Sequence, residues 1–298
     1  MANDEKGTEK PLKVLVAGAT GYLGSNVVRE CKRRGYWVRA LARNPEKLEK
    51  IGIKELCDDI FVGEATKDET LEGLCDGIDV VFSSIGFMTF DKKPLIWDVD
   101  YGANMNIVRR AKAAGVKHFV FTSTIGSKEM AKTVKIAEAK EAVAKALQES
   151  GMNWTVTQPT GFFDDTRKQF EVIKSRGTAY VFGSGQTKYN PIHGIDLAKV
   201  SVDAFTNPEM KNKYVPVGGP ETFTHEEVAL LAFKVLGKEP RIRHIPIWVL
   251  KLISIIARPF NQNLADMICF FVAIGGMELD APHYGEHRLE DFLRTLVD

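Results

Sequence analysis

The stretch VLVAGATGYLGSNVVRECKRRGYWVRALAR, residues 14–43, decides the fold. A short apolar run leads into Gly18, Gly21 and Gly24, and a second apolar run follows at 37–42. Between them the pattern is helical, and one face of the helix is apolar (Leu23, Val27, Val28 and Cys31). A strand, a glycine-rich turn, a helix and a second strand in this order predict a dinucleotide-binding βαβ unit.

The three glycines have different tasks in such a unit. Gly18 permits the tight turn, Gly21 lets the backbone approach a pyrophosphate, and Gly24 lets the helix pack closely on the strand. The helix N-terminus then offers free N–H groups and a partial positive charge to the phosphates. The predicted contacts of this loop with the cofactor are Gly18, Thr20, Gly21, Tyr22, Leu23 and Gly24.

The end of the second strand indicates which dinucleotide is bound. An NAD enzyme usually carries Asp or Glu there, to bind the ribose 2′-hydroxyl, but this strand ends Leu41-Ala42-Arg43-Asn44. Arg43 suits a 2′-phosphate, because its guanidinium can form charge-assisted, bidentate bonds. NADPH is therefore the expected cofactor. The alternative is that Arg43 is a surface residue paired with Glu46.

The rest of the chain continues the alternation of strands and helices. Further strands are predicted at 60–62, 80–84, 119–122 and 154–157, with helical segments between them, which indicates a parallel sheet covered on both faces. After Gly161 the pattern is less regular. It predicts helices at 165–174, 196–205 and 225–236 and a strand at 179–182.

These elements predict an α/β protein with a doubly wound parallel Rossmann sheet and a small, mostly helical C-terminal cap. We expect a disordered polar tail at 1–11, an NAD(P)-binding Rossmann domain at 12–160, and a substrate-binding cap at 161–298 packed on it. The polar first ten residues cannot form the apolar core of a signal peptide, so a cytoplasmic or organelle-stroma location is expected.

Composition argues against several other classes of protein. With 40 basic and 39 acidic residues among 298, the chain lacks the basic excess of a nucleic-acid binder. Its four cysteines show no metal-type spacing and are expected to be reduced thiols. The run His283-Tyr-Gly-Glu-His287 matches a zinc-binding pattern in letters, but Gly285 interrupts the helix that the pattern needs, so no metal site is predicted.

The segment 245–277 is strongly apolar but is interrupted by Lys251, Arg258, Pro259 and Asp266. It predicts two amphipathic helices rather than one membrane-spanning helix. These helices can pack on the core, line a substrate pocket, form a homodimer interface or lie on a membrane surface. Adjacent residues point about 100° apart on a helix, so we expect one of the two neighbouring phenylalanines, Phe270, to face the substrate.

Four stretches together resemble an atypical short-chain dehydrogenase/reductase of the NmrA-like and isoflavone-reductase-like group. They are GATGYLG at 18–24, DVVFSSIG at 79–86, VDYGANMNIVRRAKAAGVKHFVFTSTIG at 99–126 and SGMNWTVTQPTGFF at 150–163. The resemblance implies an apolar small-molecule substrate and a set of site residues. Those expected to bind cofactor are Glu64, Ala65, Ser83, Ser84, Ile85, Gly86, Thr122, Pro159, Thr160, Gly161 and Phe162, and those expected near substrate are Phe87, Met88, Phe163, Tyr189 and His193.

Typical members of this superfamily use Tyr-x-x-x-Lys and a serine, the tyrosine protonating the carbonyl oxygen. The matching segment here is KIAEAKEAVAKALQESG, 135–151, with Lys140 as the lysine and Ile136 in the place of the tyrosine. Lys140 shares a helical stripe with Ile136, Val143 and Leu147, and a lysine there is costly to desolvate without a partner. We expect Lys140 and Ser123 to be the catalytic residues, with Lys140 also contacting the cofactor.

The predicted function is reduction of an apolar, conjugated acceptor by NADPH, with hydride passing to an enone, vinyl or quinone-like group. Loss of the tyrosine suits an activated double bond better than a simple ketone. The alternative is an NADP(H)-binding redox sensor or assembly protein of the NmrA-like type that does not turn over.

Overall fold

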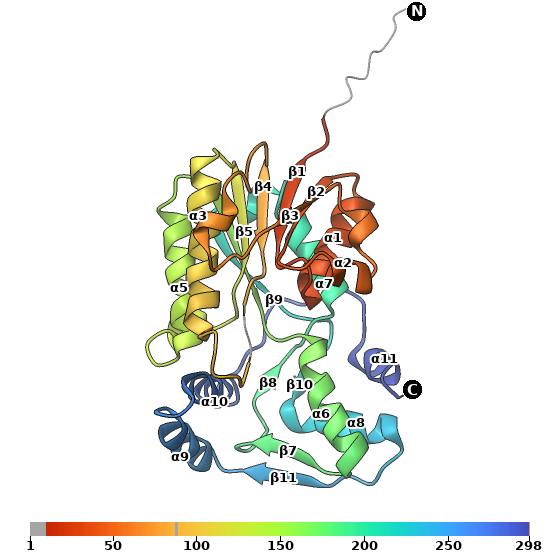
Figure 1. Ribbon diagram of the computed structural model, residues 1–298. Coiled ribbons are helices and arrows are strands. Elements are labelled where there is room, and N and C mark those ends of the chain that lie inside the picture. Colours follow the sequence, from red (N-terminus) through yellow and green to blue (C-terminus); the bar gives the residue numbers. More distant parts are fainter. Residues whose placement is uncertain (1–9, 87–88, 298) are drawn as a thin grey trace, which may run out of the picture.

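The computed structural model describes residues 10–86 and 89–297, and its centre is a seven-stranded parallel sheet (Figure 1). The strand order is β3-β2-β1-β4-β5-β6-β9, and it reverses between β1 and β4. The predicted doubly wound Rossmann sheet is confirmed. The strands are β1 (Lys13–Ala17), β2 (Trp37–Ala42), β3 (Asp59–Val62), β4 (Val80–Ser83), β5 (His118–Thr122), β6 (Asn153–Pro159) and β9 (Lys213–Val217).

Helices cover both faces of the sheet, as its two-sided apolar strands require. In β1, Val14 and Val16 belong to the core beneath α1 (Tyr22–Arg33) and α7 (Gly194–Asp203). Leu15 and Ala17 belong instead to the core beneath α3 (Asn104–Ala113) and α5 (Lys135–Gln148). The short α2 (Glu46–Lys50) follows β2 on the side of α1 (Figure 1).

The sheet draws one strand and one helix from the segment predicted as a cap. β9 pairs with β6 at the edge of the sheet, and α7 packs along α1. At this contact the Tyr22 hydroxyl accepts a hydrogen bond of 2.9 Å from the backbone N–H of Gly194. A Cβ on Gly194 would lie 2.8 Å from the Tyr22 ring, so the two helices approach closely there.

The remaining elements form a lobe below the carboxyl ends of the strands (Figure 1). α6 (Phe163–Arg176), α8 (His225–Leu236) and α11 (Leu289–Arg294) share an apolar core. β7 (Ala179–Phe182) pairs with β11 (Ile242–Ile245), and β8 (Lys188–Tyr189) pairs with β10 (Phe223–Thr224). The strand predicted at 179–182 and the helix at 225–236 are confirmed.

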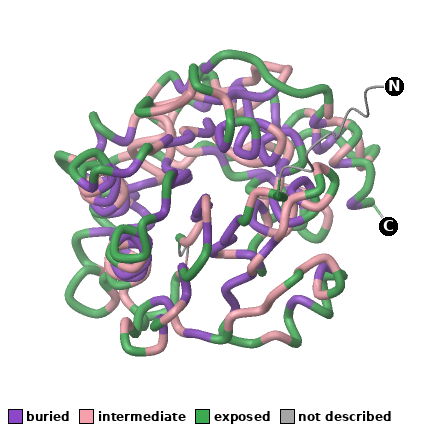
Figure 2. Tube along the Cα trace, turned by 90° about the horizontal axis from the view of Figure 1, so that it is seen from above, coloured by how far each residue is buried: buried purple, intermediate pink, exposed green. Residues whose placement is uncertain are grey.

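The apolar segment near the C-terminus forms two helices, α9 (Ile247–Ala257) and α10 (Gln262–Ile274), as predicted. Within 10–86 and 89–297, no helix is long and apolar enough to cross a membrane. α10 packs against α5. The main contact of α9 is with α10. Seen from above, buried residues gather in the interior and exposed residues lie mostly at the periphery (Figure 2).

Candidate functional site

The glycine loop after β1 forms a cradle for a phosphate group. Gly18 has a φ of +87°, and its carbonyl accepts a 2.9 Å hydrogen bond from the Gly21 N–H. No side chain caps the N-terminus of α1, and its first turn contains no acidic residue. The free N–H groups and the positive end of the helix dipole therefore give this loop a partial positive charge. These residues fit a dinucleotide pyrophosphate.

Arg43 and Glu64 lie side by side at the ends of β2 and β3. Arg43 Nη1 is 3.5 Å from Glu64 Oε2, and 64% of the arginine side chain is exposed. The pairing partner is thus Glu64 rather than the Glu46 considered from the sequence. Ala65 is buried, and its carbonyl accepts a hydrogen bond from Asn106. The guanidinium remains available at the strand end where a 2′-phosphate is expected.

The end of β4 lies beside the glycine loop. A Cβ on Gly18 would lie 3.0 Å from Ser84 Oγ, so Ser84 and the loop border the same crevice at the switch point. Ser83 is different, because its hydroxyl is fully buried and donates to Asn104 Oδ1 at 2.6 Å. Its hydroxyl is held by Asn104, and its place in the cofactor channel stays a prediction. Phe87 and Met88 lie outside the described residues.

Lys140 occupies the apolar stripe of α5 that the sequence predicts, and the structure adds its partner. Its Nζ lies 3.3 Å from Asp100 Oδ1, with 14% of the lysine and 2% of the aspartate side chain exposed. Asp100 stands in a π-helical turn, Asp98–Ala103, that precedes α3. Such turns are frequent at functional sites. A Cβ on Gly86 would lie 3.4 Å from Nζ, so the ammonium group reaches the loop after β4.

Sequence reasoning did not identify Asp100, although it offered a signal. A lysine on a buried stripe needs a partner, and Asp100 lies in one of the stretches that carry the family resemblance. The sequence pattern could not predict the π-helical turn before α3, which brings the Asp100 carboxylate next to Lys140 of α5.

Ser123 directly follows β5, and it is a buried residue whose hydroxyl has no hydrogen-bond partner within the described chain. Its backbone N–H donates to Thr157, and the preceding Thr122 bonds the side chain of Thr157. A buried, unpaired hydroxyl is costly, which makes Ser123 Oγ a natural donor or acceptor for a bound ligand.

A cavity of about 370 Å³ lies between the sheet and the lower lobe. Thr160, Gly161 and Phe162, at the carboxyl end of β6, form one of its borders. Its apolar wall comprises Val172, Tyr180, Val181, Phe182, Tyr189, Phe271, Ile274 and Leu279.

Besides Thr160, five polar residues border the cavity: Asp165, Thr166, Lys168, Gln169 and His225. Tyr189 stacks on His225 with ring centres 4.5 Å apart. The Asp165 carboxylate accepts a hydrogen bond from the Phe162 N–H. The cavity is therefore an apolar slot with a short polar side, suited to a flat hydrophobic molecule.

Three residues expected near substrate lie elsewhere. Phe163 is buried in the core shared by α6 and α11. Phe270 packs beneath α5 with Ile136, because α10 turns that face toward α5. Its neighbour Phe271 lines the cavity in its place. Tyr189 lines the cavity as expected, whereas His193 does not belong to its wall.

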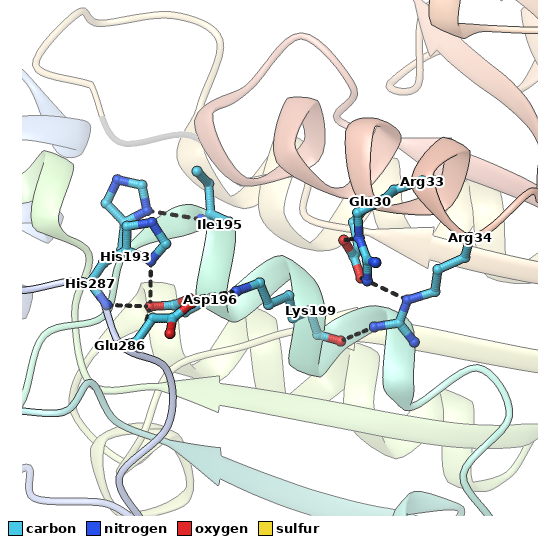
Figure 3. Close-up of polar contacts among 9 residues, drawn as sticks. All are labelled: Glu30, Arg33, Arg34, His193, Ile195, Asp196, Lys199, Glu286 and His287. Atoms are coloured by element: carbon cyan, nitrogen blue, oxygen red, sulfur yellow. Dashed lines mark hydrogen bonds and ion pairs between the residues drawn. The ribbon is translucent and has the colours of Figure 1, made fainter.

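His193 instead caps α7 and joins a clamp on the C-terminal segment (Figure 3). Its Nδ1 accepts from the Ile195 N–H, and its ring stacks on His287 with centres 4.5 Å apart. Asp196 accepts hydrogen bonds from the backbone N–H groups of Glu286 and His287, and His287 Nδ1 lies 2.9 Å away. Burial lowers the pKa of His193 and favours its neutral form.

Residues 18–208 match a family model described as NAD(P)H-binding. The chain belongs to this NAD(P)H-binding family. The matched range begins at the glycine cradle and includes Arg43, Lys140 and the carboxyl ends of β4, β5 and β6, so the geometry above lies on the family's cofactor-binding framework.

Relatives of this NAD(P)H-binding chain include a chloroplastic divinyl chlorophyllide a 8-vinyl-reductase from Arabidopsis thaliana. It is 29% identical over 97% of this chain and 77% of its own length. A photosystem II assembly factor, Ycf39 of Trieres chinensis, is 28% identical over 87% of this chain and 81% of its own. An Escherichia coli NADPH-dependent quinone oxidoreductase shares the fold, with a TM-score of 0.75 at 17% identity, covering 96% and 100% of the two chains.

Proposed function

We propose that the protein is an NADPH-dependent reductase that reduces a conjugated carbon–carbon double bond of an apolar acceptor. The cavity at the end of β6 carries this proposal, because its wall is apolar and one border is the segment Thr160–Phe162, expected beside the nicotinamide. Bound NADPH would supply the hydride. The vinyl-reductase relative, at 29% identity, supports a vinyl group as the acceptor.

The chain's own residues can manage the proton that such a reduction needs. Lys140 holds an ammonium group at the loop after β4, and Asp100 fixes its position. Ser123 offers an unpaired hydroxyl at the end of the neighbouring strand. The resemblance places the family's tyrosine at Ile136, which packs in the core beside Phe270 and carries no acid. Without a tyrosine to protonate a carbonyl oxygen, Lys140 and Ser123 suit protonation of carbon better.

The deciding experiment is steady-state oxidation of NADPH by the full-length protein with a panel of acceptors. Divinyl chlorophyllide a, a short-chain quinone and a terpenoid enone would represent the three acceptor types. We expect turnover with divinyl chlorophyllide a or with the enone, and a product heavier by two hydrogens on mass spectrometry. Turnover with the quinone alone, which takes up hydrogen at its carbonyl oxygens, would contradict reduction of a carbon–carbon double bond. Tight NADPH binding without oxidation in any of these mixtures would contradict the proposal.

A non-catalytic role as an NADP(H) sensor or assembly protein is the second candidate, and the Ycf39 relative at 28% identity favours it. Under this reading the nucleotide would change the affinity for a partner rather than be consumed. Pull-down from a cell extract with and without NADPH, combined with the turnover assay, separates the two functions. Partner binding that depends on the nucleotide, together with zero turnover, would establish the second.

Arg43→Asp should weaken NADPH binding while leaving NADH binding nearly unchanged. The replacement removes the cation expected at the 2′-phosphate and adds a repulsive charge next to Glu64, so we expect a loss of roughly tenfold or more. Fluorescence titration with both cofactors measures it. Lys50→Asp makes the same change of charge on exposed α2 and serves as the control. A wild type that binds both cofactors equally well would refute the NADPH assignment.

Phe271→Ala and Phe270→Ala form a matched pair that tests the cavity. Phe271 lines it and is only half-buried, so its loss should raise KM for an apolar acceptor about tenfold and lower the melting temperature less than the loss of Phe270 does. Phe270 is only 9% exposed in the core against α5, so its loss should cost roughly 3–5 kcal/mol of folding free energy. Thermal unfolding and acceptor kinetics distinguish the two. Identical behaviour of both variants would remove Phe271 from the substrate site.

A further inference from the structure

One helix of the lower lobe leaves most of its apolar surface in solvent. α9 buries only Leu250 and Ser254 among its residues. Ile247 and Val249 are half-buried, and the remaining large apolar side chains of α9, with that of Phe260 just beyond it, are exposed. The exposed apolar residues are Trp248 (67%), Leu252 (48%), Ile253 (43%), Ile255 (69%), Ile256 (59%) and Phe260 (72%). We call these six residues the α9 apolar face.

The α9 apolar face is continuous rather than scattered. At about 100° per residue, Ile255, Trp248, Leu252, Ile256 and Ile253 follow one another around roughly 160° of the helix. The two buried residues lie on the opposite side, against α10. An apolar arc of this width, on a helix whose main packing neighbour among the described elements is α10, indicates a binding surface.

The chain segment that contains the face carries cations and no acidic residue of its own. From residue 240 to residue 265 the chain contains no Asp or Glu, but it carries Arg241, Arg243, Lys251 and Arg258. All four are exposed, and Lys251 and Arg258 lie along one border of the apolar arc. Arg258 also contacts Asp266 of α10 at 3.1 Å. For a chain with a net charge of +1, this is a local concentration of cations.

We propose that α9 docks flat on the surface of an anionic lipid bilayer. Interfacial helices combine an apolar arc containing Trp, Phe and Leu or Ile with lysine and arginine along its edge, where the cations meet lipid phosphates. Trp248 suits the boundary between headgroups and acyl chains. A second copy of the chain fits less well, because a two-fold contact through this face would bring Lys251 and Arg258 close to their own copies.

The proposal is tested by flotation of the full-length protein with vesicles. We expect it to float with vesicles of equimolar phosphatidylcholine and phosphatidylglycerol, more weakly with phosphatidylcholine alone, and less at high salt. The double variant Ile255→Ser, Ile256→Ser should bind at least about tenfold more weakly, because both side chains contribute only to the exposed arc. Its melting temperature and NADPH affinity should match those of the wild type.

Two control variants sharpen the test. Leu230→Ser removes an exposed apolar side chain from α8, and it should leave flotation unchanged. Lys251→Glu should reduce binding to the anionic vesicles, whereas Lys112→Glu, at the far end of α3, should not. Failure of the wild type to float, or unchanged flotation of the double isoleucine variant, would overturn the proposal. So would a dimer in analytical ultracentrifugation that the double variant converts to a monomer, without vesicle binding.

Discussion

Gly24→Ala should abolish tight NADPH binding, and we expect it to be the most damaging single replacement in the glycine loop. A Cβ at this position would lie 2.1 Å from the carbonyl oxygen of Gly18 and 2.6 Å from its carbon. Both are backbone atoms, so no side-chain rotation can relieve the clash. The loop or α1 must move, at a cost of roughly 1–3 kcal/mol or more in folding free energy.

The measurement is a cofactor titration combined with thermal unfolding. Binding should weaken at least about tenfold, because the displaced N–H groups no longer converge on the pyrophosphate. Gly102→Ala is the matched control, since a Cβ there meets nothing within 4 Å and its backbone is helical. Wild-type affinity in a folded Gly24→Ala protein would show that this loop does not hold the cofactor.

Lys140→Met should reduce turnover by about 10²–10⁴-fold, the usual contribution of a general acid or base, while cofactor binding persists. Methionine keeps the length and apolar packing of the side chain but removes the ammonium group. Because Asp100 loses this cation, we also expect a lower melting temperature, so the assay temperature must lie well below it.

Three further variants isolate the role of the charge. Lys145→Met, exposed on the same helix, should behave like the wild type. Lys140→Arg keeps the charge near Asp100 and should recover stability more fully than turnover. Asp100→Asn should lower kcat with little change in KM, if its task is to position Lys140. Full turnover in folded Lys140→Met would exclude this lysine from the reaction.

The sheet was largely predictable because its central strands β1, β4 and β5 are buried on both faces and therefore form apolar runs between glycine-ended helices. β9 was missed. Its sequence, Lys213-Tyr-Val-Pro-Val217, includes a proline that argues against a central strand, yet an edge strand tolerates it. β9 pairs with β6 only after the chain has left the sheet and come back, and no local sequence pattern predicts such a long-range pairing.

The site was predictable wherever a local motif defines it, as in the glycine loop and the stripe that contains Lys140. Contacts between distant segments were not predictable. The adjacency of Phe270 and Phe271 implied that only one could face substrate, but the packing of α10 on α5 selects Phe271. His193 drew attention as a polar residue near the pocket, yet its neighbours are set by a C-terminal segment far away in sequence.

The late position of β9 has a consequence for synthesis of the chain on the ribosome. Until residue 217 emerges, β6 can pair with β5 but its other edge stays open, while the first elements of the lower lobe are already being made. Exposed edges recruit other strands, so this interval is when nascent chains are most prone to aggregate or to engage chaperones. Stalled nascent chains should therefore resist protease across the sheet only after β9 has left the exit tunnel. Protection soon after β6 emerges would show that six strands suffice.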